Sequence, residues 1–511
     1  MPILVVLALA AACAPVEWLA PLTGGGREVA VGFAATAVGL ALAVAITLRR
    51  WVVRTLRHSP IRKPDIADTY SRVRRVMFFL NIGTVTLAVL VFGWGWFVQN
   101  TVVVQQLGDD GKPLLAPFAE LLVPLPYFAM LLVAWLVYYD AERALHRTTV
   151  LGPIDRPFWS RAGYMFNHAR QFALLVMLPV LLFAFQQTIL RFDPETTQAD
   201  WFQIASLACM PLLLIAMPLL IKPVLGLTSM PAGPIRERLE ALAARLHFRC
   251  SDFLLWPTHG AAANDMIVGL VPRIRYVVFT DRILEDLPAD ELDAVFGHEV
   301  GHAKHGHIWN YAAFLALSMT VLAALLLCIG MELDAAGVTV PMWARTWVKL
   351  VPMLFVAGYI FVVFGHLSRR CERQADVYGC RAVSCGDSNC TGHGERTLYP
   401  ERAVGLCATG IRTFVRALER VGLSHGHTEP AAERRSLGAF VKEIFAWLAA
   451  WQHSTMPRRV TFLLNLIGHP ERERRFQRSV TLMRWGLMLS LVAALYGLGS
   501  AVGWSELWKY M

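Results

Sequence analysis

Long apolar stretches alternate with short charged segments along most of the chain. Each stretch is nearly free of charged residues and comes close to the roughly 20 residues that a helix needs to cross a bilayer. The pattern therefore predicts a mainly α-helical, polytopic membrane protein with about nine spans. They are expected at residues 3–20, 29–48, 76–98, 118–138, 172–190, 202–222, 312–331, 347–367 and 480–503.

The first apolar stretch also allows a second interpretation, because its length suits a secretory signal peptide. It contains Pro15 and Glu17, which weaken it as a span, but it lacks the basic residues that precede the apolar part of a signal. We interpret it as a span.

The hydrophobic pattern changes after residue 222. Beyond the turn at Met230–Pro234, apolar residues recur at helical spacing from Ile235 to about His247. Three short β-rich runs follow, and a Pro-containing turn separates the last two, which predicts a hairpin. They are Phe253–Trp256, Asp265–Gly269 and Ile274–Phe279. Helices are expected from Asp281 and from Pro288, with Pro288 in the first helical position, and the second should continue towards the span near Ala312.

Spans and polar segments together predict five regions. Residues 1–222 form an N-terminal transmembrane region. Residues 223–310 and 368–478 form two parts of one metallopeptidase domain, separated by two transmembrane helices in 311–367, and 479–511 hold the last span. Within 368–478, residues 403–421 and 440–451 show helical spacing.

Composition supports the membrane assignment, because 56% of the 511 residues are hydrophobic and only 17% are charged. A formal charge of +10 suggests a nucleic-acid partner, but its distribution argues against one. Basic residues gather in 49–75 and 143–170, whereas the alternate connections carry mainly acidic ones. This positive-inside pattern places the N-terminus in the cytoplasm, and the basic charge reflects topology, with the lipid bilayer as partner and no nucleic acid.

One motif carries clear chemistry. His298, Glu299 and His302 form a His-Glu-x-x-His pattern. On a helix, residues four apart share a face, so the two histidines can bind one Zn²⁺ ion while Glu299 takes a proton from a water that the metal activates. The alternative is two surface histidines on a charged helix.

A catalytic zinc needs a third protein ligand. The metzincin layout requires a histidine ten residues after His298, but Ile308 occupies that position. His305 and His307 are interpreted as loop or surface histidines. Glu372 is a better candidate, because the predicted topology returns it to the same side of the membrane, although a Glu after a span is weak evidence alone.

The chain resembles the integral-membrane gluzincin metalloprotease family that includes the CAAX prenyl endoprotease and the heat-shock protease HtpX. The resemblance rests on Asn264–Gly269, Thr280-Asp281 with Leu284, Asp290–Val295, Gly297–His302 and Glu372–Asp376, the last being a Glu-x-x-x-Asp signature. It covers roughly residues 235–310 and 365–465. It implies that His298, His302 and Glu372 bind zinc, that Glu299 is the general base, and that Asp376 holds a histidine in place.

The same resemblance implies how a substrate is held. Asn264, with Met266 and Val268, would bind a peptide that adds to the edge strand, although Asn264 also suits a turn. The family's late His-Pro pair, with an Arg six residues after the His, is degraded here. His453 and Arg459 keep the interval but the proline is lost. They are expected either to polarise the carbonyl or stabilise the tetrahedral oxyanion, or to form a solvated surface pair.

Nine cysteines are present, and several of them crowd one segment. Cys380, Cys385, Cys390 and His393 are candidates for a second, structural zinc, although their spacings match no standard zinc knuckle. The alternative is a set of reduced or incidentally paired thiols.

The sequence thus predicts a membrane-embedded zinc endopeptidase that cleaves polypeptides, chiefly membrane proteins, near the cytoplasmic face. A site-two-type intramembrane protease is less consistent, because Asp290, Glu291 and Asp293 precede the motif and are too polar for a membrane interior. A third hypothesis is an inactive scaffold or transporter with a protease-like domain, for which the retained ligands and base have no purpose.

Overall fold

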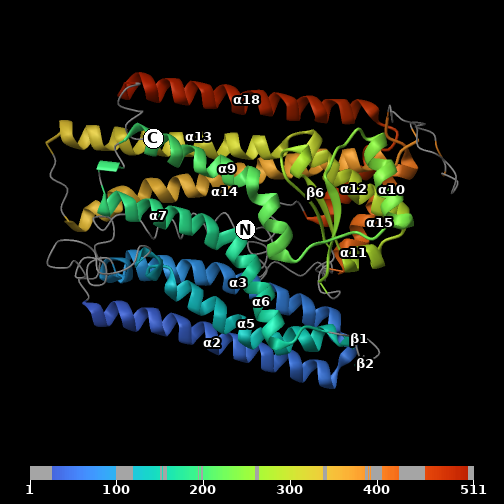
Figure 1. The fold of residues 1–511 in the computed structure, drawn as a ribbon, viewed down its shortest axis with the longest axis horizontal. Coiled ribbons are helices and arrows are strands. Elements are labelled where there is room, and N and C mark those ends of the chain that lie inside the picture. The colour runs from blue at the N-terminus through green and yellow to red at the C-terminus, as the bar shows by residue number, and fades with distance from the viewer. Residues whose placement is uncertain are drawn as a thin grey trace, which may run out of the picture. The chain divides into compact units, whose positions relative to one another are not determined.

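The computed structural model describes residues 26–98, 119–149, 152–153, 158–193, 195–196, 199–258, 264–337, 342–385, 390, 392, 405–424 and 455–503. The chain forms two compact units, one of Met1–Leu212 with Gly337–Val351 and Met511, the other of Leu213–Ala336 with Pro352–Tyr510 (Figure 1).

The first unit is helical. Its main helices are α2 (Arg27–His58), α3 (Lys63–Leu90), α4 (Trp94–Phe97), α5 (Leu125–His146), α6 (Arg161–Phe172) and α7 (Leu178–Phe192), with a two-residue strand pair, β1 (Thr148–Thr149) and β2 (Gly152–Pro153). Along α2, buried alanines recur every three or four residues, at Ala30, Ala34, Ala37, Ala41 and Ala45. Small side chains on one face let neighbouring helices approach closely, as in membrane helix packing.

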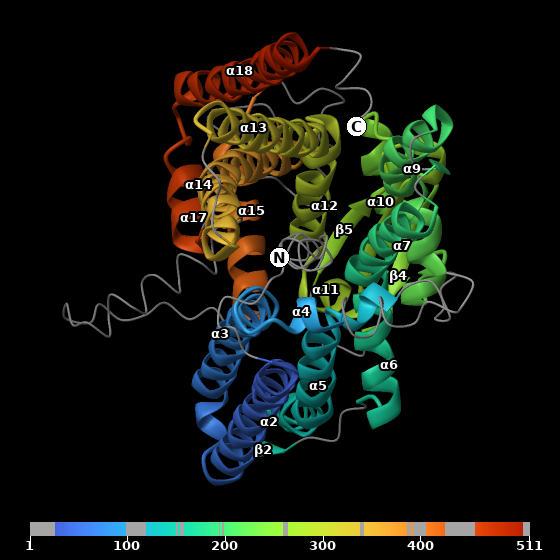
Figure 2. The ribbon, with the colours of Figure 1, turned by 90° about the vertical axis from the view of Figure 1, so that its left-hand side faces the viewer.

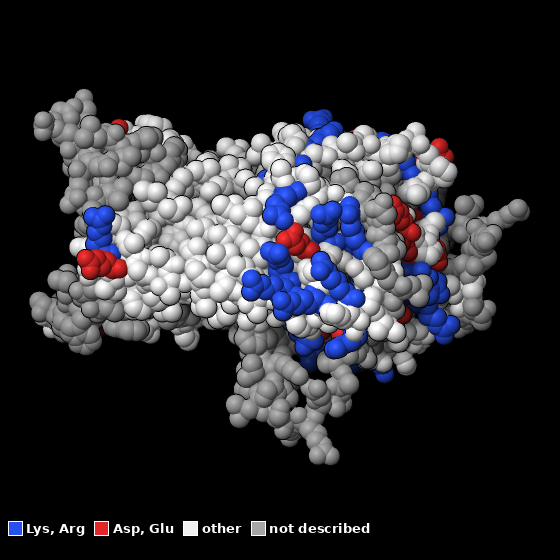
Figure 3. All heavy atoms as spheres, turned by 90° about the horizontal axis from the view of Figure 1, so that it is seen from below, with Lys and Arg blue, Asp and Glu red and all other residues white. Residues whose placement is uncertain are grey.

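Three described helices are long and apolar enough to cross a membrane: Arg27–His58, His307–Leu333 and Pro470–Ala501. They correspond to three of the nine predicted spans. The segments predicted at 76–98, 118–138, 172–190, 202–222 and 347–367 also lie largely on helices, and residues 3–20 are outside the described part. Figure 3 shows one face on which basic side chains gather beside a broad uncharged area, as expected of a membrane protein.

The second unit contains a four-stranded sheet in the order β3-β4-β6-β5. Its strands are β3 (Thr228–Ser229), β4 (Asp252–Trp256), β5 (Asp265–Val268) and β6 (Tyr276–Thr280). The predicted hairpin is confirmed, because β5 and β6 pair antiparallel, with Met266 opposite Val278. The parallel pairing of β4 with β6 and the short strand β3 were not predicted.

Helices α10 (Pro234–Arg245), α11 (Asp281–Asp286) and α12 (Ala289–Lys304) accompany the sheet. Phe296 of α12 is completely buried and meets the rings of Phe248, Phe253 and Phe279 at centroid distances of 5.7–6.4 Å. This aromatic cluster fixes α12 beside the sheet, next to β5 (Figure 2).

The motif helix does not continue into the next span, contrary to expectation. It begins at Ala289, one residue after Pro288, and ends at Lys304, and a new helix, α13 (His307–Ala335), follows. Gly306 lies between them with φ 61°, a left-handed conformation that favours glycine and ends a helix. The chain therefore turns at this point before entering the apolar segment.

The remaining helices of this unit are α14 (Met342–Ala382), α15 (Ala408–Ser424), α17 (Met456–Leu464) and α18 (Pro470–Val502), and α9 (Asp200–Leu225) enters it from residue 213. Side chains of α13, α14 and α18 share one hydrophobic cluster, which includes Phe314, Ile360 and Met483. The predicted helix at 403–421 is seen as α15, and that at 440–451 lies outside the described residues.

Candidate metal centre

Glycines bring the two helices of the site into close contact. A Cβ atom on Gly297 would lie 2.5 Å from Cβ of Ala382, and one on Gly301 would lie 2.8 Å from Cβ of Tyr378. Similarly, a Cβ on Gly379 of α14 would lie 2.8 Å from the carbonyl oxygen of Ala294. The absence of these side chains lets α12 and α14 approach at backbone distance, which places the histidines of one helix against the carboxylates of the other.

Three side chains converge between these helices. Nε2 of His298 lies 3.2 Å from Nε2 of His302 and 3.9 Å from Oε2 of Glu372. Nε2 of His302 lies 3.6 Å from Oε1 of Glu372. Tetrahedral zinc with bonds of about 2.0–2.1 Å holds its ligand atoms about 3.3 Å from one another. The three predicted ligands therefore have the chemistry and the spacing for one zinc ion.

The outer nitrogens of both histidines show which nitrogens are free to bind. Nδ1 of His298 lies 3.0 Å from Oδ1 of Asp376, so it carries the hydrogen. Nδ1 of His302 lies 2.9 Å from Nδ1 of His307, whose Nε2 lies 3.1 Å from Oε1 of Gln374. Because an amide oxygen only accepts, Nε2 of His307 donates and its Nδ1 accepts from His302. The inward Nε2 of His302 consequently presents a lone pair, and that of His298 does so in the neutral form of its imidazole, the form that binds a metal.

His307 is thus a part of the site, and its interpretation as a loop or surface histidine is wrong. It is 1% exposed. The orientation of its partner Gln374 is itself fixed, because Nε2 of Gln374 donates to Oε1 of Gln477 at 2.7 Å. His305 is half-buried against the ring of Tyr378, at 5.7 Å between centroids. The only sequence signal for His307 was the glycine before it, which allows the chain to turn back beneath His302.

Charge in this cluster is balanced by Arg459 of α17. Its Nε donates to Oδ2 of Asp376 at 2.9 Å, its Nη2 donates to Oδ1 of the same residue, and its Nη1 lies 4.0 Å from Oε2 of Glu372. Burial opposes the guanidinium charge, but the Asp376 carboxylate outweighs it and raises the pKa of Arg459. Burial likewise opposes the charge of Asp376, whose pKa is nevertheless lowered, chiefly by Arg459. The two remain an ion pair.

Burial, together with His298, lowers the pKa of His302 to about 3. The imidazole is therefore neutral at ordinary pH, the form that binds a metal. On the other side of the site, burial and the charge of Glu299 raise the pKa of Asp265, whose Oδ2 is buried. The raised pKa of Asp265 disfavours a second negative charge beside Glu299.

Glu299 faces the open edge of the sheet. Its Oε2 accepts a hydrogen bond from the amide of Ile267 at 3.3 Å. Thr280 donates its amide to the carbonyl of Asn264, so residues 264, 266 and 268 pair with β6, and the main-chain groups of Asp265 and Ile267 point to the open side. Of the predicted substrate residues, Asn264 therefore forms the main-chain pair at the end of the hairpin far from its turn. The main-chain groups of Met266 and Val268 point to β6.

The other predicted site residues fall into two groups. Cys385 and Cys390 lie close to Cys407, whereas Cys380 is completely buried within the hydrophobic cluster of α14 and α15. His453 and His393 lie outside the described residues.

The site combines two histidines from one helix, a carboxylate from a second helix and a glutamate beside an edge strand. This is the arrangement of zinc metallopeptidases of the His-Glu-x-x-His type. Residues 230–478 match the family model described as Peptidase family M48.

Individual proteins of known name are also similar to the chain in sequence. The chain is 27% identical over 232 residues to "CAAX prenyl protease 1 homolog" of Arabidopsis thaliana, covering 43% of this chain and 51% of that protein. It is 36% identical over 113 residues to "Protease HtpX homolog" of Aeropyrum pernix, covering 20% of this chain and 33% of that protein. The chain thus spans about half the length, or less, of these curated relatives.

The fold is similar to a solved structure described as "Crystal Structure of S. mikatae Ste24p". The TM-score is 0.53 at 14% identity, and the match covers 86% of this chain and 99% of that one. The similarity of fold extends into residues 1–222, for which the sequence motifs indicated no related family.

A first prediction concerns His307. Replacing it with Leu removes the acceptor for Nδ1–H of His302, so we expect zinc affinity at this site to fall about 10- to 100-fold. His307→Asn retains an oxygen acceptor and should recover much of the loss. Zinc content after dialysis against graded chelator concentrations gives the affinity, with His305→Leu as the control. Equal zinc retention in His307→Leu and in the control would show that His307 does not orient the ligand.

Proposed function

We propose that the protein is a membrane-embedded zinc endopeptidase that hydrolyses peptide bonds of membrane or membrane-associated proteins. The observation that carries the proposal is the convergence of Nε2 of His298 and Nε2 of His302, 3.2 Å apart, beside the Glu372 carboxylate. Two imidazole nitrogens and a carboxylate oxygen that converge in this way are a ligand set of catalytic zinc sites. An inactive scaffold has no need of such a cluster.

Each residue then has a role in the reaction. His298, His302 and Glu372 would hold Zn²⁺, which supplies Lewis acidity to the attacking water and the scissile carbonyl when bound. Glu299 takes the proton of that water and delivers it to the leaving amine. Asp376 orients His298, and Arg459 holds Asp376 and Glu372 in place. His453 is proposed to stabilise the oxyanion. Arg459 suits this role less well, because its guanidinium contacts Asp376 and Glu372.

The substrate is proposed to bind along β5. A peptide lying antiparallel to this strand can pair with the main-chain groups of Asp265 and Ile267, which point to the open side. It would displace the bond from Ile267 to Glu299 and free the carboxylate for catalysis. Main-chain pairing suits the cleavage of many sequences, and side chains of Met266 and Val268 would line one face of the strand.

The site is proposed to lie near the cytoplasmic face of the membrane. Glu372 and His302 both lie just outside apolar helix segments, and basic residues gather in the connections on the same predicted side. One relative named in the comparison is a CAAX prenyl protease, which makes prenylated proteins one candidate substrate class, and membrane proteins in general the other.

Cleavage of casein by the purified full-length protein tests the proposed function. We expect hydrolysis that phenanthroline abolishes and that added Zn²⁺ restores, and no hydrolysis by His302→Ala at any zinc concentration. The protein purified without a chelator and the His305→Leu variant serve as positive controls. Hydrolysis that persists in the metal-free protein would exclude a zinc peptidase, whereas a zinc-loaded protein without hydrolysis would favour the scaffold.

A further inference from the structure

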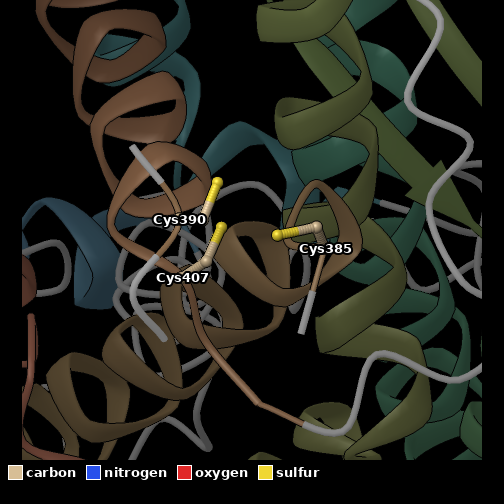
Figure 4. A group of neighbouring side chains, drawn as sticks. All are labelled: Cys385, Cys390 and Cys407. Atoms are coloured by element: carbon tan, nitrogen blue, oxygen red, sulfur yellow. The ribbon is translucent and has the colours of Figure 1, made fainter. Parts of the chain in front are cut away.

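A second cluster of potential metal ligands lies outside the site already described. Cys385 follows the end of α14, Cys407 immediately precedes α15, and Cys390 lies in the segment between them. Their sulfur atoms all lie within 4.8 Å of one another. Figure 4 shows the Cys385 side chain directed towards those of Cys390 and Cys407.

The surroundings of the sulfurs suit thiolates. The amide of Gly410 donates to Sγ of Cys407 at 3.2 Å, and Oγ1 of Thr409 lies 3.4 Å from Sγ of Cys390. Both partners belong to the first turn of the 17-residue helix α15, whose positive dipole end therefore faces the cluster. Three thiolates with one divalent cation leave a net negative charge, which this helix end stabilises.

A glycine makes this meeting of segments possible. A Cβ atom on Gly410 would lie 2.4 Å from Oγ of Ser384 and 2.9 Å from the carbonyl oxygen of Cys380. Without it, the first turn of α15 lies directly against the end of α14, and Ser384 accepts the amide of Cys407 at 3.2 Å. The backbone is therefore already in the position that brings Cys407 to Cys385.

We propose that Cys385, Cys390 and Cys407 bind a second zinc ion, with a structural function. Three converging soft donors select a thiophilic cation, and zinc is bound by thiolates in tetrahedral structural sites. Cys407 takes the place that the spacing had suggested for Cys380. This site shares no residue with the proposed catalytic centre.

The second zinc ion clamps the end of α14 to the start of α15. The first of these helices carries Glu372 and Asp376, and the second carries Phe414, whose ring stacks on that of His298 at a centroid distance of 5.7 Å and an angle of 22°. Fixing the junction of the two helices therefore fixes two walls of the catalytic centre relative to each other. A structural metal contributes its binding energy directly to folding.

Cobalt substitution of the full-length protein tests the second site without reference to activity. Thiolate ligands give Co²⁺ an intense near-ultraviolet sulfur-to-metal charge-transfer band, which a centre of two histidines and a glutamate does not produce. We expect this band in the wild-type protein and in His298→Ala/His302→Ala, and its loss in Cys385→Ser/Cys390→Ser. Cys250→Ser, which alters a half-buried thiol elsewhere in the same unit, is the matched control and should keep the band.

Elemental analysis gives the second readout. The zinc-loaded wild-type protein should contain two equivalents of zinc, and the double serine variant and the double alanine variant one each. Absence of the charge-transfer band in the wild-type protein, or a disulfide between two of the three cysteines in freshly purified protein mapped by mass spectrometry, would overturn the proposal. Neither result bears on the catalytic zinc, whose loss would show in the histidine variant alone.

Discussion

Glu299→Gln is expected to lower kcat/KM for peptide hydrolysis by about 100- to 10,000-fold, the usual contribution of general acid–base catalysis. The Gln side chain has the same shape and keeps an oxygen that can accept the amide of Ile267, which now donates to Oε2 at 3.3 Å. It lacks the basicity to take a proton from water. Because Glu299 is not one of the three converging ligands, zinc content should not change. Hydrolysis of casein and zinc analysis on the same preparation measure both quantities.

The control for this variant is Glu285→Gln, which makes the same chemical change at an exposed position on α11. It should match the wild-type rate. Undiminished proteolysis by Glu299→Gln would mean that another group takes the proton. Loss of zinc from the variant would instead mean that the carboxylate belongs to the metal ligands, as its presence in one cluster with His298 and His302 allows.

The second large effect concerns stability. Arg459→Met should destabilise the metal-free protein by about 3–5 kcal/mol, the cost of leaving one partner of a buried ion pair without the other. Arg459 is 7% exposed and Asp376 is completely buried, so water cannot replace the guanidinium. Thermal unfolding in one detergent, after chelation so that zinc binding does not mask the change, provides the measurement.

Two further variants separate the ion pair from the mere loss of a side chain. Arg458→Met removes the exposed neighbouring arginine and should change stability by no more than about 0.5 kcal/mol. Arg459→Met with Asp376→Asn removes both charges and should recover a part of the loss, because no uncompensated carboxylate then remains. Equal unfolding temperatures for Arg459→Met and Arg458→Met would contradict the buried pair.

Local pattern was sufficient to predict the parts of this molecule that depend on neighbouring residues. His298 and His302 share a helix face because of their spacing, and β5 and β6 pair because a short turn joins them. Apolar length predicted the three membrane-length helices. Each of these features depends on residues that are close together in the sequence.

Contacts between distant segments were predicted poorly. Cys407 lies near Cys385 although 22 positions of sequence separate them. The close packing of the first turn of α15, at Gly410, against the end of α14 brings the two cysteines together. His307 appeared to be a surface residue because the turn at Gly306, which directs it beneath His302, leaves no periodic signal. Arg459 was expected near the substrate, but its nearest partners are Asp376 and Glu372, which only the packing of α17 reveals.

The position of bound zinc tests the central claim most directly. In a crystal of the full-length protein, we expect an anomalous peak at the zinc edge about 2.0–2.2 Å from Nε2 of His298, Nε2 of His302 and a carboxylate oxygen of Glu372. The anomalous map of a His302→Ala crystal should lack that peak and retain a second peak between Cys385, Cys390 and Cys407. A proteolytically active protein with no metal between α12 and α14 would contradict the account.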